Sequence, residues 1–82
     1  MDALLLKART AGFAGDFETA YPIWLEAADK GNAEAQNAIG YCYNFGKVVT
    51  KDFAEALHWY RKAADHGYMK AQYNLGLIYS RG

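Results

Sequence analysis

Apolar residues recur along this chain three and four positions apart, which is the spacing of one face of an α-helix. In one such stripe Phe17, Ala20, Trp24 and Ala27 fall on a single face. No stretch shows the strict alternation of a β-strand. Glycine and aspartate interrupt the pattern and predict five helices: from about Asp2 to Gly12, from Asp16 to Gly31, from Asn32 to Gly46, from Asp52 to Gly67, and from about Met69 to Ser80.

Residues at the expected helix ends have the chemistry of caps. Asp16, Asn32 and Asp52 can each accept a hydrogen bond from a free backbone N–H of the helix that follows. Asp52 and Glu55 have the spacing of a capping box, and Gly31 suits the left-handed conformation that ends a helix. Pro22 falls about six residues into the second helix. We therefore expect a kink or an irregular first turn there.

The chain from residue 16 onward repeats itself at an interval of 36 residues. Such a period is typical of stacked, near-identical helical units, which present surfaces to partners more often than they build reactive clefts. Twelve of the thirty-one residues from 16 to 46 recur 36 positions later: Asp16, Phe17, Ala20, Ala27, Ala28, Asp29, Gly31, Ala35, Gln36, Gly40, Tyr43 and Gly46.

Gly40 and Gly76 occupy the same position of this repeat, inside predicted helices where glycine is unfavourable. We therefore expect both to lie in similar surroundings, at helix crossings where a bulky neighbour fills the space. Tyr43 and Tyr79 are expected to pack on the opposite side, with their hydroxyls reaching a polar partner.

The motif Ala35-Gln36-x-x-Ile39-Gly40-x-x-Tyr43-x-x-Gly46, followed by Trp59-Tyr60-x-Lys62-Ala63-Ala64-x-x-Gly67, resembles the Sel-one-like repeat, a family of helix-pair solenoids related to tetratricopeptide repeats. The resemblance implies an all-α, right-handed helix-pair solenoid of about two and a half repeats. It divides the single domain 1–82 into a degenerate N-terminal helix pair (1–31), a full repeat (32–67) and the first helix of a further repeat (68–82).

Two positions depart from the family pattern. Val48 stands where the family usually has a second glycine, so we expect the loop backbone to differ there. Ala11 stands where Tyr43 and Tyr79 occur in the later units. We interpret the first helix as an atypical N-terminal cap of the repeat array.

Composition excludes several classes of function. Lys plus Arg equals Asp plus Glu, nine each, and no basic run is present, so neither nucleic acid nor an anionic membrane is an expected partner. The single cysteine, Cys42, cannot form an internal disulfide. The N-terminal residues lack the long apolar run of an export signal, and no stretch is apolar enough to span a membrane. We expect a cytoplasmic protein.

Residues able to do chemistry are scattered. His58, His66 and Cys42 lie without a third ligand at a metal-binding spacing, so we expect no metal, and Cys42 is interpreted as a small buried apolar residue. The carboxylates are interpreted as caps or solvated side chains, Glu34 among the latter. We expect no cofactor and no enzymatic activity. A hydrolase of the β-lactamase-like branch is the least favoured reading, because those relatives are rich in paired cysteines.

The resemblance implies that the first helix of each pair lines a concave groove, and we predict that this groove binds another protein or an extended peptide. The chain would then be a small adaptor, regulator or inhibitor subunit. Tyr41 and Tyr73 fit the groove and packing between helices equally well. The predicted groove residues are Leu5, Arg9, Asn37, Tyr41, Asn44, Phe45, Tyr73, Leu77 and Arg81.

A second surface is predicted on the fifth helix, where Leu75, Leu77, Ile78 and Tyr79 would lack the packing helix that follows in the family. Soluble proteins rarely expose such a patch. We expect a second copy of the chain, giving a homodimer, or another partner to cover it. A structural homo-oligomer and a fragment of a longer array therefore stay open as alternatives.

Overall fold

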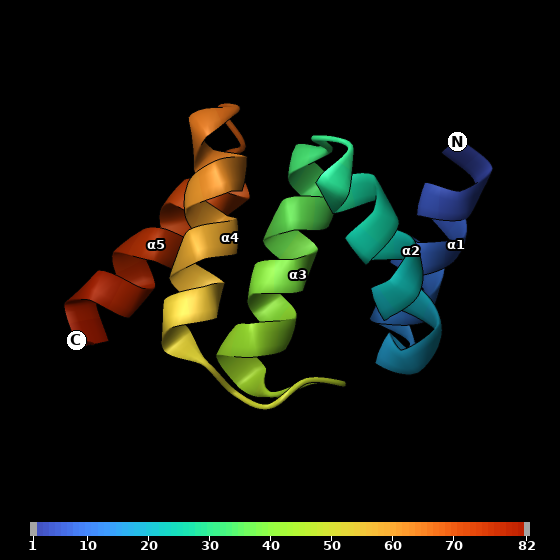
Figure 1. Ribbon diagram of the computed structural model, residues 1–82, viewed down its shortest axis with the longest axis horizontal. Coiled ribbons are helices and arrows are strands. Elements are labelled where there is room, and N and C mark those ends of the chain that lie inside the picture. Colours follow the sequence, from blue (N-terminus) through green and yellow to red (C-terminus); the bar gives the residue numbers. More distant parts are fainter. Residues whose placement is uncertain (1, 82) are drawn as a thin grey trace.

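The computed structural model describes residues 2–81, and the side chains of residues 3–80 within them. Five helices and no strand occur among these residues, which confirms the all-α prediction. Each helix packs chiefly against its neighbours in the sequence, giving the side-by-side row seen in Figure 1. The helices are α1 (Asp2–Phe13), α2 (Phe17–Asp29), α3 (Ala33–Phe45), α4 (Phe53–Asp65) and α5 (Met69–Arg81).

The predicted N-terminal caps are confirmed. Asn32 Oδ1 accepts from the Ala35 N–H at 2.8 Å, and Asp16 and Asp52 accept from the first turns of α2 and α4. The Asp52 N–H does not complete a capping box with Glu55. It donates to the carbonyl of Tyr43 at 2.9 Å, which ties the α3–α4 loop to the end of α3.

The predicted glycine ends are confirmed as well. Gly31, Gly46 and Gly67 have φ values of 92°, 68° and 81°, in the left-handed region where glycine carries no penalty from a side chain. Helix α2 runs through Pro22.

The 36-residue repeat is visible as repeated contacts. Gln36 Nε2 donates to the carbonyl of Ala28 at 3.1 Å, and Gln72 Nε2 donates to the carbonyl of Ala64 at 3.5 Å. Each glutamine on the first helix of a pair thus adds a side-chain hydrogen bond to a carbonyl at the end of the preceding helix, which also accepts the backbone N–H of Gly31 or Gly67. This explains why all four residues recur at the same interval.

The core is built around one large aromatic residue in each of α2 and α4. Trp24 is buried between α1, α2 and α3, and a Cβ at Gly12 would lie 2.7 Å from its ring. Tyr60 takes the equivalent place in α4 and is fully buried beside Ala56 and Ile78. Small residues facing these rings let the helices approach closely.

The prediction for the two repeated glycines holds for Gly40 and is wrong for Gly76. A Cβ at Gly40 would lie 2.6 Å from Cδ1 of Tyr60, whereas a Cβ at Gly76 would have nothing within 4 Å. The difference has a simple cause. The ring that fills the space at Gly40 comes from the helix after α3, and α5 is the last helix among the described residues.

The α3–α4 loop contains a strained residue. Val48 has φ of 70°, in the left-handed region that favours glycine, and its side chain is half exposed. A β-branched residue is unfavourable in this conformation because its side chain crowds the backbone. Val48 thus has a backbone conformation suited to glycine, the residue that the family usually has at this position.

Candidate protein-binding groove

A hollow of about 330 Å³ lies between α3 and α5. Its rim is apolar, since Tyr41, Phe45 and Leu77 each expose between about two fifths and half of their surface. Two of its lining residues, Asn44 and Asn74, carry side-chain amides. We call this the Asn44 hollow, and its lining residues are Tyr41, Asn44, Phe45, Asn74 and Leu77.

Asn44 is the unusual residue of this hollow. It is only 5% exposed, and its Oδ1 has no hydrogen-bond partner among the described residues. A buried amide oxygen without a partner costs roughly 1–3 kcal/mol, so such groups are nearly always satisfied. By contrast, Asn74 Nδ2 donates to Asn37 Oδ1 at 3.0 Å, which links α5 to α3.

Tyr41 stands between this hollow and a second one. Its ring stacks on Phe17 at 5.8 Å between centroids and contacts Phe45 at 4.6 Å, yet 38% of its surface stays exposed. From the sequence, Tyr41 could either pack between helices or line the groove. In the structure it does both. Three aromatic side chains from α2 and α3 form a continuous wall with Tyr41 in the middle.

The second hollow, of about 280 Å³, lies where α1, α2, α3 and the start of α5 meet. Phe13 at the end of α1 is 89% exposed, so this hollow too has an apolar edge open to solvent. Arg9 and Lys70 contribute the charges, and no carboxylate is part of its lining. We call it the Arg9 hollow, and its lining residues are Arg9, Gly12, Phe13, Phe17, Trp24, Asn37, Ala38, Tyr41 and Lys70.

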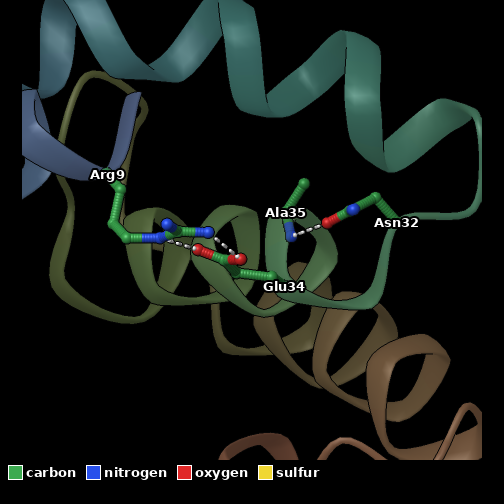
Figure 2. Close-up of polar contacts among 4 residues, drawn as sticks. All are labelled: Arg9, Asn32, Glu34 and Ala35. Atoms are coloured by element: carbon green, nitrogen blue, oxygen red, sulfur yellow. Dashed lines mark hydrogen bonds and ion pairs between the residues drawn. The ribbon is translucent and has the colours of Figure 1, made fainter. Parts of the chain in front are cut away.

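The guanidinium of Arg9 is held by Glu34. Nε and Nη2 of Arg9 donate to the two carboxylate oxygens of Glu34, each at 2.8 Å, and join α1 to the first turn of α3 (Figure 2). These hydrogen bonds, helped by the positive charges of Arg9 and Lys70, lower the pKa of Glu34 against the opposing effect of its partial burial. Glu34 is thus a structural ion-pair partner, and its interpretation as a solvated side chain is wrong.

Two predicted groove residues, Leu5 and Tyr73, are not brought to these hollows, and a third, Arg81, is not tested. Leu5 packs partly buried against the core and lines a separate hollow between α1 and α2, because the apolar side chain turns toward Ile23 and Ala27 of α2. Tyr73 is 68% exposed on α5 and lines neither hollow. The side chain of Arg81 lies outside the described residues. The other six, Arg9, Asn37, Tyr41, Asn44, Phe45 and Leu77, line the two hollows together.

The predicted patch on α5 needs correction as well. Ile78 is only 9% exposed and packs on Tyr60, with Leu75 partly buried beside them, because both side chains face α4. Tyr79 stays exposed, and its hydroxyl accepts from Nη2 of Arg61 at 2.6 Å, the polar contact expected for it. The open face of α5 is therefore formed by Gly76 with the exposed side chains of Tyr73, Leu77 and Tyr79.

Sequence reasoning missed Phe13, Lys70 and Asn74 as lining residues. The first helix is predicted to end at about Gly12, but α1 runs to Phe13 and places this residue at the edge of the Arg9 hollow. Asn74 aligns with Ala38 of the preceding unit, so the repeat itself gave no signal. A polar residue inside an otherwise apolar stretch of α5 is the only hint that could have identified it.

The other residues considered for chemistry are His58, His66 and Cys42. Among residues 3–80, no three His, Cys, Asp or Glu side chains are grouped so as to hold a metal ion. His58 and His66 are exposed. Cys42 is fully buried, and burial raises the pKa of its thiol to about 11, so it stays protonated at neutral pH, as expected of an apolar packing residue. None of the described helices has both the length and the apolar character needed to span a bilayer.

The sequence of this chain is similar to short segments of much longer curated proteins. The chain is 41% identical over 69 residues to the ERAD-associated E3 ubiquitin-protein ligase component HRD3A of Arabidopsis thaliana, a match over 83% of this chain and 10% of that protein. It is 33% identical over 63 residues to chitin synthase regulatory factor 2 of Schizosaccharomyces pombe, which covers 77% of this chain and 12% of the relative. The chain thus spans about a tenth of the length of these relatives.

A solved structure shows the same fold. It is a protective antigen from uropathogenic Escherichia coli strains that displays an SLR fold, with a TM-score of 0.89 and 31% sequence identity over 96% of this chain and 18% of that one. The sequence of this chain also matches the Sel1 repeat over residues 33–68 and 70–82. The helix-pair solenoid is therefore established by sequence and by structure, and the chain belongs to the Sel1 repeat family.

Proposed function

We propose that this chain is a non-catalytic protein-interaction module that binds a segment of a partner protein in a groove formed by the Asn44 and Arg9 hollows. The relatives support an interaction or regulatory role, since one is a component of a ubiquitin ligase and another a regulatory factor. The module would serve as an adaptor, regulator or inhibitor subunit.

One observation carries this proposal: Tyr41, Phe45 and Leu77 form a partly exposed apolar rim around a hollow that is also lined by the amide side chains of Asn44 and Asn74. A binding site commonly combines an apolar surface with a few polar groups that fix the orientation of the ligand. The helices around the hollow are held by the Asn74–Asn37 hydrogen bond. A groove that is formed before binding lowers the entropic cost of association.

The test compares affinity capture by wild-type protein with capture by Leu77→Ser, which makes the rim of the Asn44 hollow polar. We expect a partner that is retained by wild type to be lost from the variant, with helical circular dichroism unchanged. Leu6→Ser is the matched control, because Leu6 is also an exposed leucine, on α1, and lines neither hollow. Equal capture by all three proteins would contradict a role for this groove.

A second function is favoured by the open surroundings of Gly76. The equivalent Gly40 is filled by Tyr60 of the next helix, so the face of α5 has the shape of a helix-packing surface. A homodimer in which α5 packs against a second copy would cover it. Sedimentation velocity at high micromolar concentration distinguishes the two functions: a monomer that still binds its partner excludes the homo-oligomer, and a dimer disrupted by Gly76→Leu supports it.

A further inference from the structure

Helices α3 and α5 have the same position in their repeat units, but one face is covered in α3 and open in α5. At three positions spaced four residues apart, and therefore on one side of the helix, α3 is buried and α5 is exposed. The buried residues of α3 are Gln36, Gly40 and Asn44. Their exposed counterparts in α5, which we call the Gly76 face, are Gln72, Gly76 and Ser80.

The helix that follows α3 accounts for this difference. Helix α3 lies between α2 and α4 (Figure 1), and the ring of Tyr60 in α4 lies where a Cβ of Gly40 would point, 2.6 Å away. Helix α5 packs on α4, with Ile78 beside Tyr60. On its other side nothing lies within 4 Å of a Cβ added at Gly76. The Gly76 face is thus a helix-packing face that the described residues leave uncovered.

Two helices of this chain show which side chains cover such a face. In α4 the aromatic Tyr60 follows Ala56 by four positions, and in α2 the aromatic Trp24 stands in the same relation to Ala20. All four residues are buried. The ring of Trp24 also fills the space beside a glycine of the preceding helix, because a Cβ at Gly12 would lie 2.7 Å from it. An alanine one turn before the ring lets the two helices approach closely.

The surface around Gly76 requires an uncharged partner. The three residues of the Gly76 face are uncharged, and the exposed rings of Tyr73 and Tyr79 lie close to them on α5. Tyr43, the counterpart of Tyr79, packs against the cluster of Ala56 and Tyr60. A charged side chain placed there would lose its hydration without gaining a partner. We therefore expect the covering helix to present apolar and small residues.

A second copy of this chain in the same fold does not offer such a helix. Trp24 and Tyr60 are the Phe, Tyr or Trp residues that follow an alanine by four positions within the helices of residues 2–81, and both are buried. The exposed rings of Phe13 and Tyr73 follow Arg9 and Met69 at that distance. A homodimer would have to cover the Gly76 face in a different way.

We propose that the Gly76 face binds an amphipathic helix of a partner protein that carries a tyrosine, tryptophan or phenylalanine four residues after an alanine. The aromatic ring lies against Gly76 as Tyr60 lies against Gly40, and Tyr79 packs beside it as Tyr43 does in the preceding unit. This site is separate from the proposed groove and does not rest on it.

A helical copy of α4 tests this proposal, because α4 covers the equivalent face of α3. The probe is a fluorescent synthetic peptide of residues 52–67, held helical by a lactam bridge between Lys62 and the new side chain of His58→Glu, two positions that are exposed on α4. We expect saturable binding to the full 82-residue chain in fluorescence anisotropy. Gly76→Leu in the chain should weaken binding about tenfold or more, because its side chain takes the place of the ring. The circular dichroism of this variant should be unchanged, since Gly76 has open surroundings.

Matched variants assign the contact. In the peptide, Tyr60→Ala should weaken binding about tenfold or more, whereas Tyr60→Trp should keep it within about threefold, since Trp24 has this role in α2. In the chain, Leu77→Ser is the control and should leave peptide binding unchanged. Leu77 is also exposed on α5, but its counterpart Tyr41 packs on Phe17 and Phe45.

Three results would overturn the proposal. One is the absence of saturable binding up to about 1 mM peptide. Another is binding that Leu77→Ser abolishes and Gly76→Leu leaves intact, which would place the peptide in the Asn44 hollow. The third is a dimer of the chain that depends on Gly76 and that the peptide does not dissociate, which would show that a second copy covers the face. Capture of a partner with Leu77→Ser tests the proposed groove separately, so the two proposals can fail independently.

Discussion

Gly40 and Gly76 occupy one position of the repeat, but an added methyl group meets opposite conditions at the two sites. At Gly40 it would lie 2.6 Å from the fully buried ring of Tyr60, so the ring or a helix would have to shift. At Gly76 nothing lies within 4 Å. The sequence predicts that glycine is required at both places, whereas the structure shows a steric requirement at one.

Alanine at the two positions should therefore change stability in opposite directions. Gly40→Ala should destabilise the fold by about 1 kcal/mol or more, since overpacking exceeds the gain in helix propensity. Gly76→Ala should stabilise it by up to about 1 kcal/mol, because only the propensity gain is left. Thermal unfolding of the two variants measures this, and a similar loss for both would show that α5 is packed against something that fills the space at Gly76.

The strained Val48 leads to a second prediction at this scale. Val48→Gly should raise stability by about 1 kcal/mol, or roughly 4–8 °C in melting temperature, because glycine adopts φ of 70° without crowding. Val49→Gly is the matched control and should lower stability, since Val49 packs against the core. A lower melting temperature for Val48→Gly would mean that its side chain contributes more than its backbone strain costs.

The helices were predictable from the sequence because their ends are chemically marked. Asp16, Asn32 and Asp52 cap helices as expected, and Gly31 and Gly46 end them. The contacts between helices could not be predicted from the sequence in the same way. The link from α1 to α3 depends on Arg9 and Glu34, which are 25 residues apart, and no local pattern pairs them.

This link should make stability depend on pH. The folded pKa of Glu34 lies below its unfolded value, so the stabilisation is fully present above the unfolded pKa of about 4.3 and is lost as the pH falls through the folded pKa. Glu34→Gln should thus melt below wild type at pH 7, and the difference should close toward pH 3. Glu26→Gln, which removes an exposed pair with Lys30, is the control and should have little effect at pH 7. A difference that persists at pH 3 would assign the loss to packing.

Across the whole molecule, the repeat predicts which residues hold the helices together better than it predicts the surface. Gln36, Tyr43 and the paired alanines recur because each unit needs them, so sequence alone identified them. Groove residues differ between units: Asn44 aligns with Ser80, and Tyr41 with Leu77. Their positions could be predicted from the repeat register, but the burial of Asn44 depends on how α3 packs against the neighbouring helices, which no local pattern shows.

The most direct test of the account is a nuclear magnetic resonance titration of the ¹⁵N-labelled chain with the captured partner or its peptide. The account predicts that the largest shifts lie at the side-chain amide of Asn44 and the backbone amides of Tyr41, Asn74 and Leu77. Shifts concentrated instead on α2 and α4, with the Asn44 amide unmoved, would contradict it.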